Sequence, residues 1–175
     1  FAEDVFDSSV QEFLNKKREL ADYFAETSEE DIFDYIPPQK TNQIFTPKKV
    51  VQMMVDQLVE TEPHIFESPD KTFVDFYMKS GLYITEIVKR LYRNKVLKSI
   101  IPDDKERVKH ILECQVFGFA PTQIIYDITM SYIFGFDEGA NNISRRNFFC
   151  EDTLPYAERG ELQKLVNEKL ADRVK

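Results

Sequence analysis

The sequence predicts an α/β protein with a parallel sheet covered by helices on both faces, preceded by a small helical arm. Short runs of β-branched and aromatic residues alternate with longer segments whose apolar residues recur every three or four positions. This alternation is typical of parallel sheets. Before the Pro-Pro pair at 37–38, the sequence shows the helical period alone. With 175 residues, of which 42% are hydrophobic, the chain has enough apolar material for one core.

The N-terminal arm is expected to hold two helices. Apolar residues between Val5 and Phe24 have helical spacing. A capping signal followed by acidic residues at 27–31 predicts a short helix through Tyr35. The double proline ends this pattern, because proline cannot continue a helix from its interior. We therefore expect a helical arm over residues 1–38 and a sheet domain over residues 39–175.

The first helix of the sheet domain is expected to begin at Thr46-Pro47. Thr46 is a suitable capping residue, and Pro47 suits the first helical position, where no N–H donor is needed. The helical spacing of its apolar residues predicts one buried stripe, made by Val50, Val51, Met54, Val55 and Leu58.

Strands and helices then alternate to the end of the sheet domain. Short aromatic and β-branched runs predict three strands, at 71–76, 115–119 and 143–149. Helical periodicity predicts four more helices, at 82–92, from Asp103 or Asp104 to 112, at 124–134 and at 161–170. Gly135 stands where the glycine that follows a helix end is expected.

The composition excludes several classes of function. The 31 acidic and 23 basic residues give a net charge of −8, which argues against a self-sufficient binder of DNA or of a membrane surface. No apolar stretch reaches the ~18 residues that a bilayer span needs. The five glycines are too dispersed for a G-x-G-x-x-G loop or a phosphate-binding P-loop. The N-terminus does not resemble a signal peptide, and the two cysteines show no C-x-x-C spacing, so a reduced cytoplasmic setting without a metal site is expected.

Three chain segments are expected to meet where the parallel strands end. Ligands of open parallel sheets bind beyond the carboxyl ends of the strands, which here are followed by residues 75–81, 119–121 and 150–154. Asp75 can accept hydrogen bonds from a cationic or hydroxyl-bearing ligand. Ser80 and Gly81 allow close approach of the backbone at a helix start, and Asp152 can accept a hydrogen bond from an exocyclic amine.

These segments resemble three motifs of the adenine-specific DNA methyltransferases of restriction–modification systems. Residues 41–51, with Phe45-Thr46-Pro47, look like the segment known as motif X. Residues 73–81 look like motif I, usually written D-P-x-x-G-S-G, and residues 147–154 are similar to the G-D-T/S-L turn of motif III. The order and spacing of the three motifs match over about residues 41–155.

The resemblance implies a partial Rossmann-like methyltransferase sheet that binds S-adenosylmethionine. It implies that Phe45, Thr46 and Pro47 line the methionine moiety. Residues of the motif I loop would surround the amino-acid and ribose parts: Asp75, Tyr77, Met78, Ser80 and Gly81. Asp152 and Thr153 would hold the adenine, and Ala120 at the end of the second strand would also contact the cofactor.

The sequence also departs from the family pattern. Phe76 and Lys79 stand where motif I has proline and glycine, and the 119–121 segment lacks the acid expected for the ribose hydroxyls. The tetrapeptide [D/N/S]-P-P-[Y/F], which holds the flipped target adenine in this family, is absent. We therefore expect the cofactor-binding subdomain of an N6-adenine DNA methyltransferase, or of the methylase region of a fused restriction enzyme, that stops before the catalytic motif. It would hold no catalytic residue, and as an isolated fragment it would not methylate DNA. DNA, and a restriction or specificity subunit or domain, would contact other regions.

Two other functions stay open from the sequence. The first alternative is a non-catalytic methyltransferase-like domain used for assembly or protein interaction, in which the cofactor pocket has decayed. The second is a different α/β enzyme that uses an adenine-containing cofactor.

Overall fold

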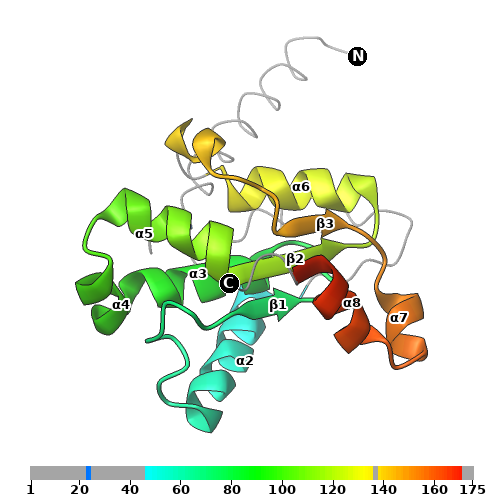
Figure 1. Cartoon of the computed structure of the whole chain (residues 1–175), viewed down its shortest axis with the longest axis horizontal. Coiled ribbons are helices and arrows are strands. Elements are labelled where there is room, and N and C mark those ends of the chain that lie inside the picture. Colours follow the sequence, from blue (N-terminus) through cyan, green and yellow to red (C-terminus); the bar gives the residue numbers. More distant parts are fainter. Residues whose placement is uncertain (1–22, 25–45, 136–137, 171–175) are drawn as a thin grey trace, which may run out of the picture.

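The computed structural model describes residues 23–24, 46–135 and 138–170. Its centre is a three-stranded parallel sheet in the order β1-β2-β3, formed by Phe73–Asp75, Val116–Ala120 and Phe148–Cys150 (Figure 1). Val74 pairs with Phe117, and Phe119 pairs with Phe149. The predicted α/β class and the three parallel strands are thus confirmed, although β1 and β3 are shorter than expected.

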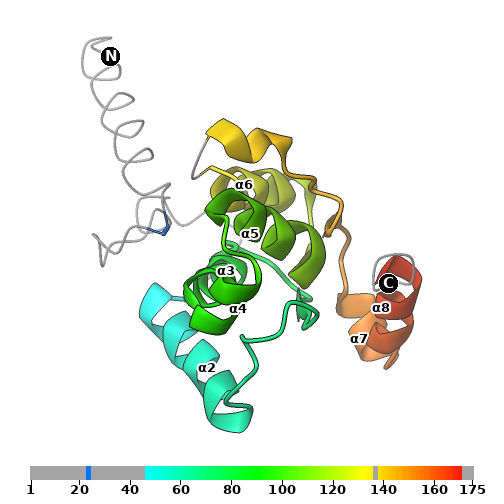
Figure 2. The same cartoon turned by 60° about the vertical axis from the view of Figure 1, so that its left-hand side comes forward.

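Helices lie on both faces of this sheet. One face carries α3 (Leu82–Arg93) and α6 (Gln123–Ile133), whose apolar residues form a single core with Val116 and Ala120 of β2. The other face carries the rings of Phe119 and Phe149, which stack at 4.9 Å. On that side lie α7 (Leu154–Glu158) and α8 (Leu162–Leu170), apart from the other helices (Figure 2). The arrangement is compatible with a partial Rossmann-like fold.

Helix α2 (Lys48–Thr61) packs beside α3 but differs from its prediction in two details. Pro47 occupies the N-cap position, and no side chain caps the helix, so the predicted Thr46 cap is wrong. The predicted buried stripe is too wide, because Val51 and Val55 are buried while Val50, Met54 and Leu58 are exposed. The narrower stripe follows from the geometry, since among the described elements α2 packs mainly against α3.

The connection from β1 to β2 contains more helix than the sequence predicts. After α3 come α4 (Lys95–Ile100), α5 (Asp104–His110) and the π-helical turn η2 (Ile111–Gln115), which leads directly into β2. Asp103 caps α5 through bonds from the Lys105 and Glu106 amides, so the predicted start at Asp103 or Asp104 is confirmed. Helix α4, which Asn94 caps, was not predicted because its six residues are too few to show a helical period.

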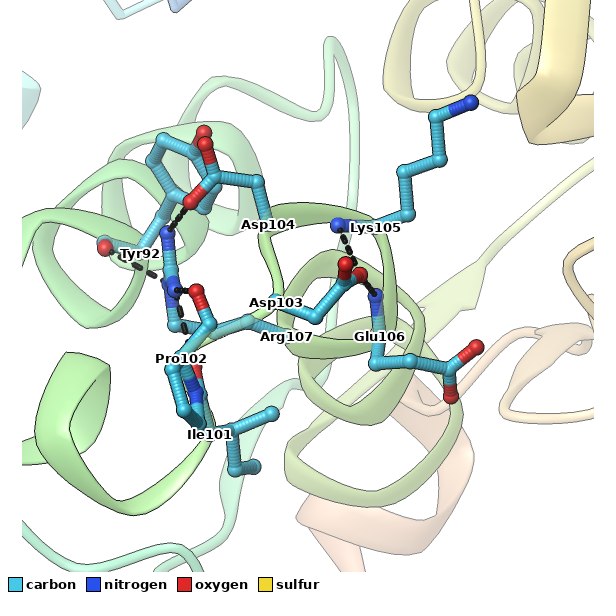
Figure 3. A network of polar contacts seen from close by, with 8 residues as sticks. All are labelled: Tyr92, Ile101, Pro102, Asp103, Asp104, Lys105, Glu106 and Arg107. Carbon is cyan, nitrogen blue, oxygen red and sulfur yellow. Dashed lines mark hydrogen bonds and ion pairs between the residues drawn. The ribbon is translucent and has the colours of Figure 1, made fainter.

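A buried arginine holds these helices together. Arg107 of α5 is 1% exposed, and its guanidinium donates to the carbonyl oxygens of Tyr92, Ile101 and Pro102 (Figure 3). It also pairs with Asp104 and lies 4.5 Å over the Tyr92 ring. The carbonyls come from the last turn of α3 and the end of α4, where helices leave acceptors unpaired.

The path from β2 to β3 runs through α6 and the 3₁₀ turn η3 (Glu138–Asn142). Gly135 follows the C-cap Phe134 as predicted, but it does not adopt the left-handed conformation. A Cβ atom at Gly135 would lie 2.4 Å from the Ser131 carbonyl oxygen. Glycine is therefore needed here for a close approach to the backbone of α6.

The predictions for residues 1–22 and 25–45, including both helices of the arm, lie outside the described residues. Tyr23 and Phe24, which were predicted to lie near the end of the first of these helices, are described and lie in a turn, so the helix prediction is wrong at these two residues. The Tyr23 hydroxyl donates to the Ile133 carbonyl oxygen at 3.1 Å, and Phe24 packs against Tyr92 with ring centroids 4.7 Å apart. Part of the predicted arm therefore contacts α3 and α6.

Within the part of the chain that the structure describes, no helix is both long and apolar enough to cross a membrane.

Candidate functional site at the carboxyl edge of the sheet

The segments that follow the three strands are joined to one another at the carboxyl edge of the sheet. The Met78 amide in the loop after β1 donates to the Phe119 carbonyl oxygen of β2 at 2.7 Å. The Thr153 hydroxyl, after β3, donates to the carbonyl oxygen of Phe76. These two bonds place residues 75–81 next to both other strand ends, as the predicted topology requires.

Asp75 is a desolvated carboxylate at the end of β1. Its Oδ1 accepts a hydrogen bond from the Tyr77 amide at 3.0 Å. Burial raises the pKa of Asp75, and the Tyr77 hydrogen bond opposes that rise. No lysine, arginine or histidine of the described residues forms an ion pair with this carboxylate. A half-buried carboxylate without a counter-charge favours a ligand that brings a cation or hydrogen-bond donors.

Met78 and Gly81 fix the loop in different ways. Met78 is fully buried and lies over Gly118, where a Cβ atom would be 2.2 Å from its sulfur. Its side chain packs the loop onto β2, so any ligand contact at this position falls to the backbone. Gly81 has a φ of +80° at the N-cap of α3, and a Cβ there would lie 2.9 Å from Thr129 of α6. Glycine is required at this position for both conformation and space.

The outer part of the loop carries Tyr77, Lys79 and Ser80. Tyr77 is exposed, and the Lys79 ammonium lies 5.7 Å from the centre of its ring. Lys79, at the position where the resembling motif has glycine, thus makes a cation–π contact with Tyr77. Ser80 is buried, and its hydroxyl accepts a hydrogen bond from the Leu82 amide at 3.4 Å.

The ends of β2 and β3 supply a buried wall and an exposed acid. Ala120 is fully buried, and no acidic residue follows it before Thr122, which caps α6. Asp152 is exposed, with its Oδ1 accepting from the Leu154 amide at 3.0 Å. Thr153 is buried beneath it and turns its hydroxyl toward Phe76. Asp152 thus has a free oxygen at the surface, whereas the Thr153 side chain is used within the fold.

Tyr83 joins the start of α2 to this edge, and sequence reasoning missed it. Its hydroxyl donates to the sulfur of Met54 in α2. Desolvation, the largest cause, and the charge of Asp75 raise the pKa of Tyr83, whereas the Thr46 side chain lowers it. Thr46 and Asp75 therefore both lie near the Tyr83 hydroxyl. The sequence did offer one signal for Tyr83: it stands two residues after Gly81, in the first turn of α3 and therefore close to the predicted site.

The other residues predicted from motif X contribute less. Pro47 is exposed at the start of α2. Phe45 lies outside the described residues.

Glu151 is a second residue that the sequence analysis passed over. It accepts a hydrogen bond from the Tyr156 hydroxyl at 2.8 Å and pairs with Lys169 of α8 at 2.7 Å. Because Lys169 also lies 5.7 Å from the centre of the Phe149 ring, this pair attaches α8 to β3. Because Lys169 neutralises the charge of the Glu151 carboxylate, Glu151 stabilises the fold and is not available to bind a ligand.

Comparison with known proteins gives one distant relation. The chain is 31% identical over 98 residues to a Mycoplasma pneumoniae protein named uncharacterized adenine-specific methylase. The match covers 56% of this chain and 23% of that protein, so the chain spans about a quarter of the relative's length. No family model and no solved structure matches the chain.

Proposed function

We propose that this chain is the S-adenosylmethionine-binding portion of an adenine-N6 DNA methyltransferase of a restriction–modification system. The observation that carries the proposal is the convergence of Thr46, the loop 75–81 and the turn 151–153 on one edge of a parallel sheet. Those are the segments whose sequences resemble motifs X, I and III. The name of the distant relative supports the same reaction class.

The residues at this edge fit the proposed cofactor. S-adenosylmethionine carries an ammonium group and a sulfonium, and it supplies the methyl group of the reaction. Asp75, which is desolvated and lacks a cationic partner among the described residues, suits a positively charged ligand. The free carboxylate oxygen of Asp152 suits the exocyclic amine of an adenine.

The proposal assigns cofactor binding to this chain and leaves the target base to other regions. The sequence holds no [D/N/S]-P-P-[Y/F] tetrapeptide, so it lacks the group that would accept the amino proton of a flipped adenine in the resembling family. With a net charge of −8, the chain also offers little attraction for phosphates. In this proposal DNA, and a restriction or specificity subunit or domain, contact the protein elsewhere, in the cytoplasm.

Calorimetric titration of the 175-residue chain with S-adenosylmethionine tests the proposal. We expect saturable binding that Asp75→Asn weakens at least tenfold. Asp70→Asn is the matched control, because Asp70 is an exposed aspartate before β1 and its replacement makes the same change of charge away from the carboxyl edge. No binding by the unaltered chain at millimolar cofactor would refute the proposal.

A second candidate function is a methyltransferase-like domain used in protein assembly. Two observations favour it: Lys79 occupies the position of a family glycine, and α2 presents an exposed apolar row made by Val50, Met53, Met54 and Leu58. This function predicts no cofactor binding, together with self-association or binding of another subunit that Met53→Lys abolishes. Sedimentation velocity of the unaltered chain and of Met53→Lys, each with and without S-adenosylmethionine, separates the two functions.

A further inference from the structure

Gly118 lies in the middle of the central strand β2, and two observations tie it to the loop 75–81. In the register of the sheet, Gly118 is paired directly with Asp75, the last residue of β1. Three residues later the loop has turned back and lays the Met78 side chain over Gly118, where a Cβ atom would lie 2.2 Å from the sulfur. Both Gly118 and Met78 are buried. The Met78 side chain therefore fills the space that a side chain at position 118 would need.

The loop contacts the end of β2 on both faces of the sheet. The Phe76 ring stacks on the ring of Phe119, with centroids 6.0 Å apart. Because successive residues of a strand face opposite sides, Phe119 and Gly118 lie on opposite faces, and so do Phe76 and Met78. Between these two contacts, the Met78 amide donates to the Phe119 carbonyl oxygen at 2.7 Å. Of the three contacts, the one between Met78 and Gly118 depends most directly on the size of the residue in β2.

We propose that Gly118 is a positioning residue for the bound cofactor, acting through Met78 on the backbone of the loop 75–81. This inference rests on the proposed function, in which that loop surrounds the amino-acid and ribose parts of S-adenosylmethionine. The residue at position 118 touches no part of the proposed site itself. Its lack of a side chain lets Met78 fold back onto β2 and so sets the distance between the loop and the strand.

A side chain at position 118 would move the loop and not only the methionine. A Cβ atom there would lie 3.0 Å from Cγ, 2.2 Å from Sδ and 2.8 Å from Cε of Met78, so rotation of the terminal methyl group does not relieve the collision. Met78 is 0% exposed, and close packing of the core leaves its side chain no alternative space of that size. The backbone that carries Met78 has to shift instead.

The shift falls on the middle of the loop because both of its ends are held. Asp75 is paired with β2, and Gly81 packs against Thr129 of α6, where a Cβ atom would lie 2.9 Å from the threonine methyl group. Residues 76–80 lie between these fixed points. They carry the backbone groups that the proposed function places around the cofactor, so their displacement should weaken binding.

Calorimetric titration with S-adenosylmethionine tests this role in Gly118→Ala, in Met78→Ala and in the variant that combines both. Gly118→Ala is expected to weaken the affinity of the folded protein by about tenfold, from overpacking beneath the loop. Met78→Ala should weaken it by about threefold, because the loop loses one of its holds on β2. In the combined variant the added methyl group enters space that the methionine has left. Its affinity should therefore lie within about threefold of the unaltered chain, tighter than that of Gly118→Ala.

Leu97→Ala is the matched control for a general loss of stability. Leu97 is a fully buried residue of α4, and α4 follows the end of α3 that lies farthest from the loop (Figure 1). Urea denaturation gives the stability loss of each variant. Leu97→Ala should be destabilised like the other variants and should keep its affinity within about twofold, below the threefold effect of one lost contact.

Three results would overturn the role of Gly118: an unchanged affinity in Gly118→Ala, a combined variant that binds no more tightly than Gly118→Ala, or an equal loss of affinity in Leu97→Ala. If Gly118→Ala does not fold, an unchanged affinity in Met78→Ala overturns it. In each case the unaltered chain still binds S-adenosylmethionine, so the proposed function stands and this inference falls. No binding by the unaltered chain refutes the proposed function itself, before any variant is compared.

Discussion

The Thr153 hydroxyl donates a hydrogen bond to the carbonyl oxygen of Phe76, across 77 positions of sequence. This bond joins the turn after β3 to the loop after β1, over the intervening end of β2. Thr153 is buried, so water cannot readily replace the contact if it is lost. This hydroxyl is thus a direct link between the two loops, in addition to the bonds that hold each of them to β2.

Thr153→Val is expected to destabilise the fold by about 1–2 kcal/mol, because it keeps the shape of the side chain while leaving the partly buried Phe76 carbonyl without its donor. Urea denaturation monitored by circular dichroism measures the loss. Thr153→Ser retains the hydroxyl and is the control, with an expected loss of less than about 1 kcal/mol. Equal stability of the valine and serine variants would show that the hydroxyl contributes nothing.

Gly81 and Gly160 allow the packing of the loop after β1 to be measured separately from its backbone conformation. Both have positive φ, +80° and +69°, but a Cβ at Gly160 meets nothing within 4 Å, whereas one at Gly81 meets Thr129 at 2.9 Å. Gly160→Ala should lose about 1–2 kcal/mol from conformation alone. Gly81→Ala should lose about 1–3 kcal/mol more, because it also overpacks the contact with α6.

Thermal and urea unfolding of the two alanine variants, run side by side, gives the difference. Gly81→Ala should also weaken S-adenosylmethionine binding, while Gly160→Ala, in the α7–α8 connection, should not. Similar stability losses in the two variants would contradict the close packing of Gly81 on α6.

The longer helices could be predicted because their burial repeats with a regular period, as the apolar stripe of α3 shows. The central strand could be predicted for a different reason, because Val116–Ala120 is entirely buried and forms one short apolar run. Short helices such as α4 and α7 have too few residues to show a period. The width of the α2 stripe depends on how much of the helix α3 covers, which is a tertiary property that local spacing does not contain.

The sequence predicted which segments meet at the candidate site, but it did not predict which side chains contact one another there. Asp75, Gly81 and Asp152 stand next to strand ends, and the topology rule places them together. Tyr83 was missed because a tyrosine within an apolar helix reads as core, and its nearness to Thr46 joins residues 37 positions apart. Met78 was expected to face the cofactor, yet Gly118 leaves a space on β2 that this side chain fills.

Arg107 is expected to be essential for stability and irrelevant to the carboxyl edge. Arg107→Met replaces the buried guanidinium with an apolar chain and leaves three carbonyls without their donor, at an expected cost of about 3 kcal/mol or more. Arg159→Met removes an exposed arginine and should cost less than about 1 kcal/mol. Urea denaturation checks both values. Under conditions where Arg107→Met is folded, its S-adenosylmethionine affinity should be unchanged, and a selective loss of affinity would contradict this assignment.

Asp75 is expected to lower the stability of the unliganded protein at neutral pH. Burial raises the pKa of its carboxyl in the folded state, so folding favours the protonated form, and the stability that this form contributes is lost as the pH rises through the raised value. Asp75→Asn keeps an oxygen for the Tyr77 amide and carries no charge. It should therefore be more stable than the unaltered chain at pH 7, and the difference should shrink toward zero as the pH falls to the ordinary carboxyl range.

Urea denaturation between pH 4 and 7 measures this trend in the free energy of unfolding, with Asp70→Asn subtracted as the control for general acid effects. An Asp75→Asn variant that is less stable than the unaltered chain at pH 7 would mean that a partner already compensates the carboxylate, and the case for a cationic ligand at this position would fail.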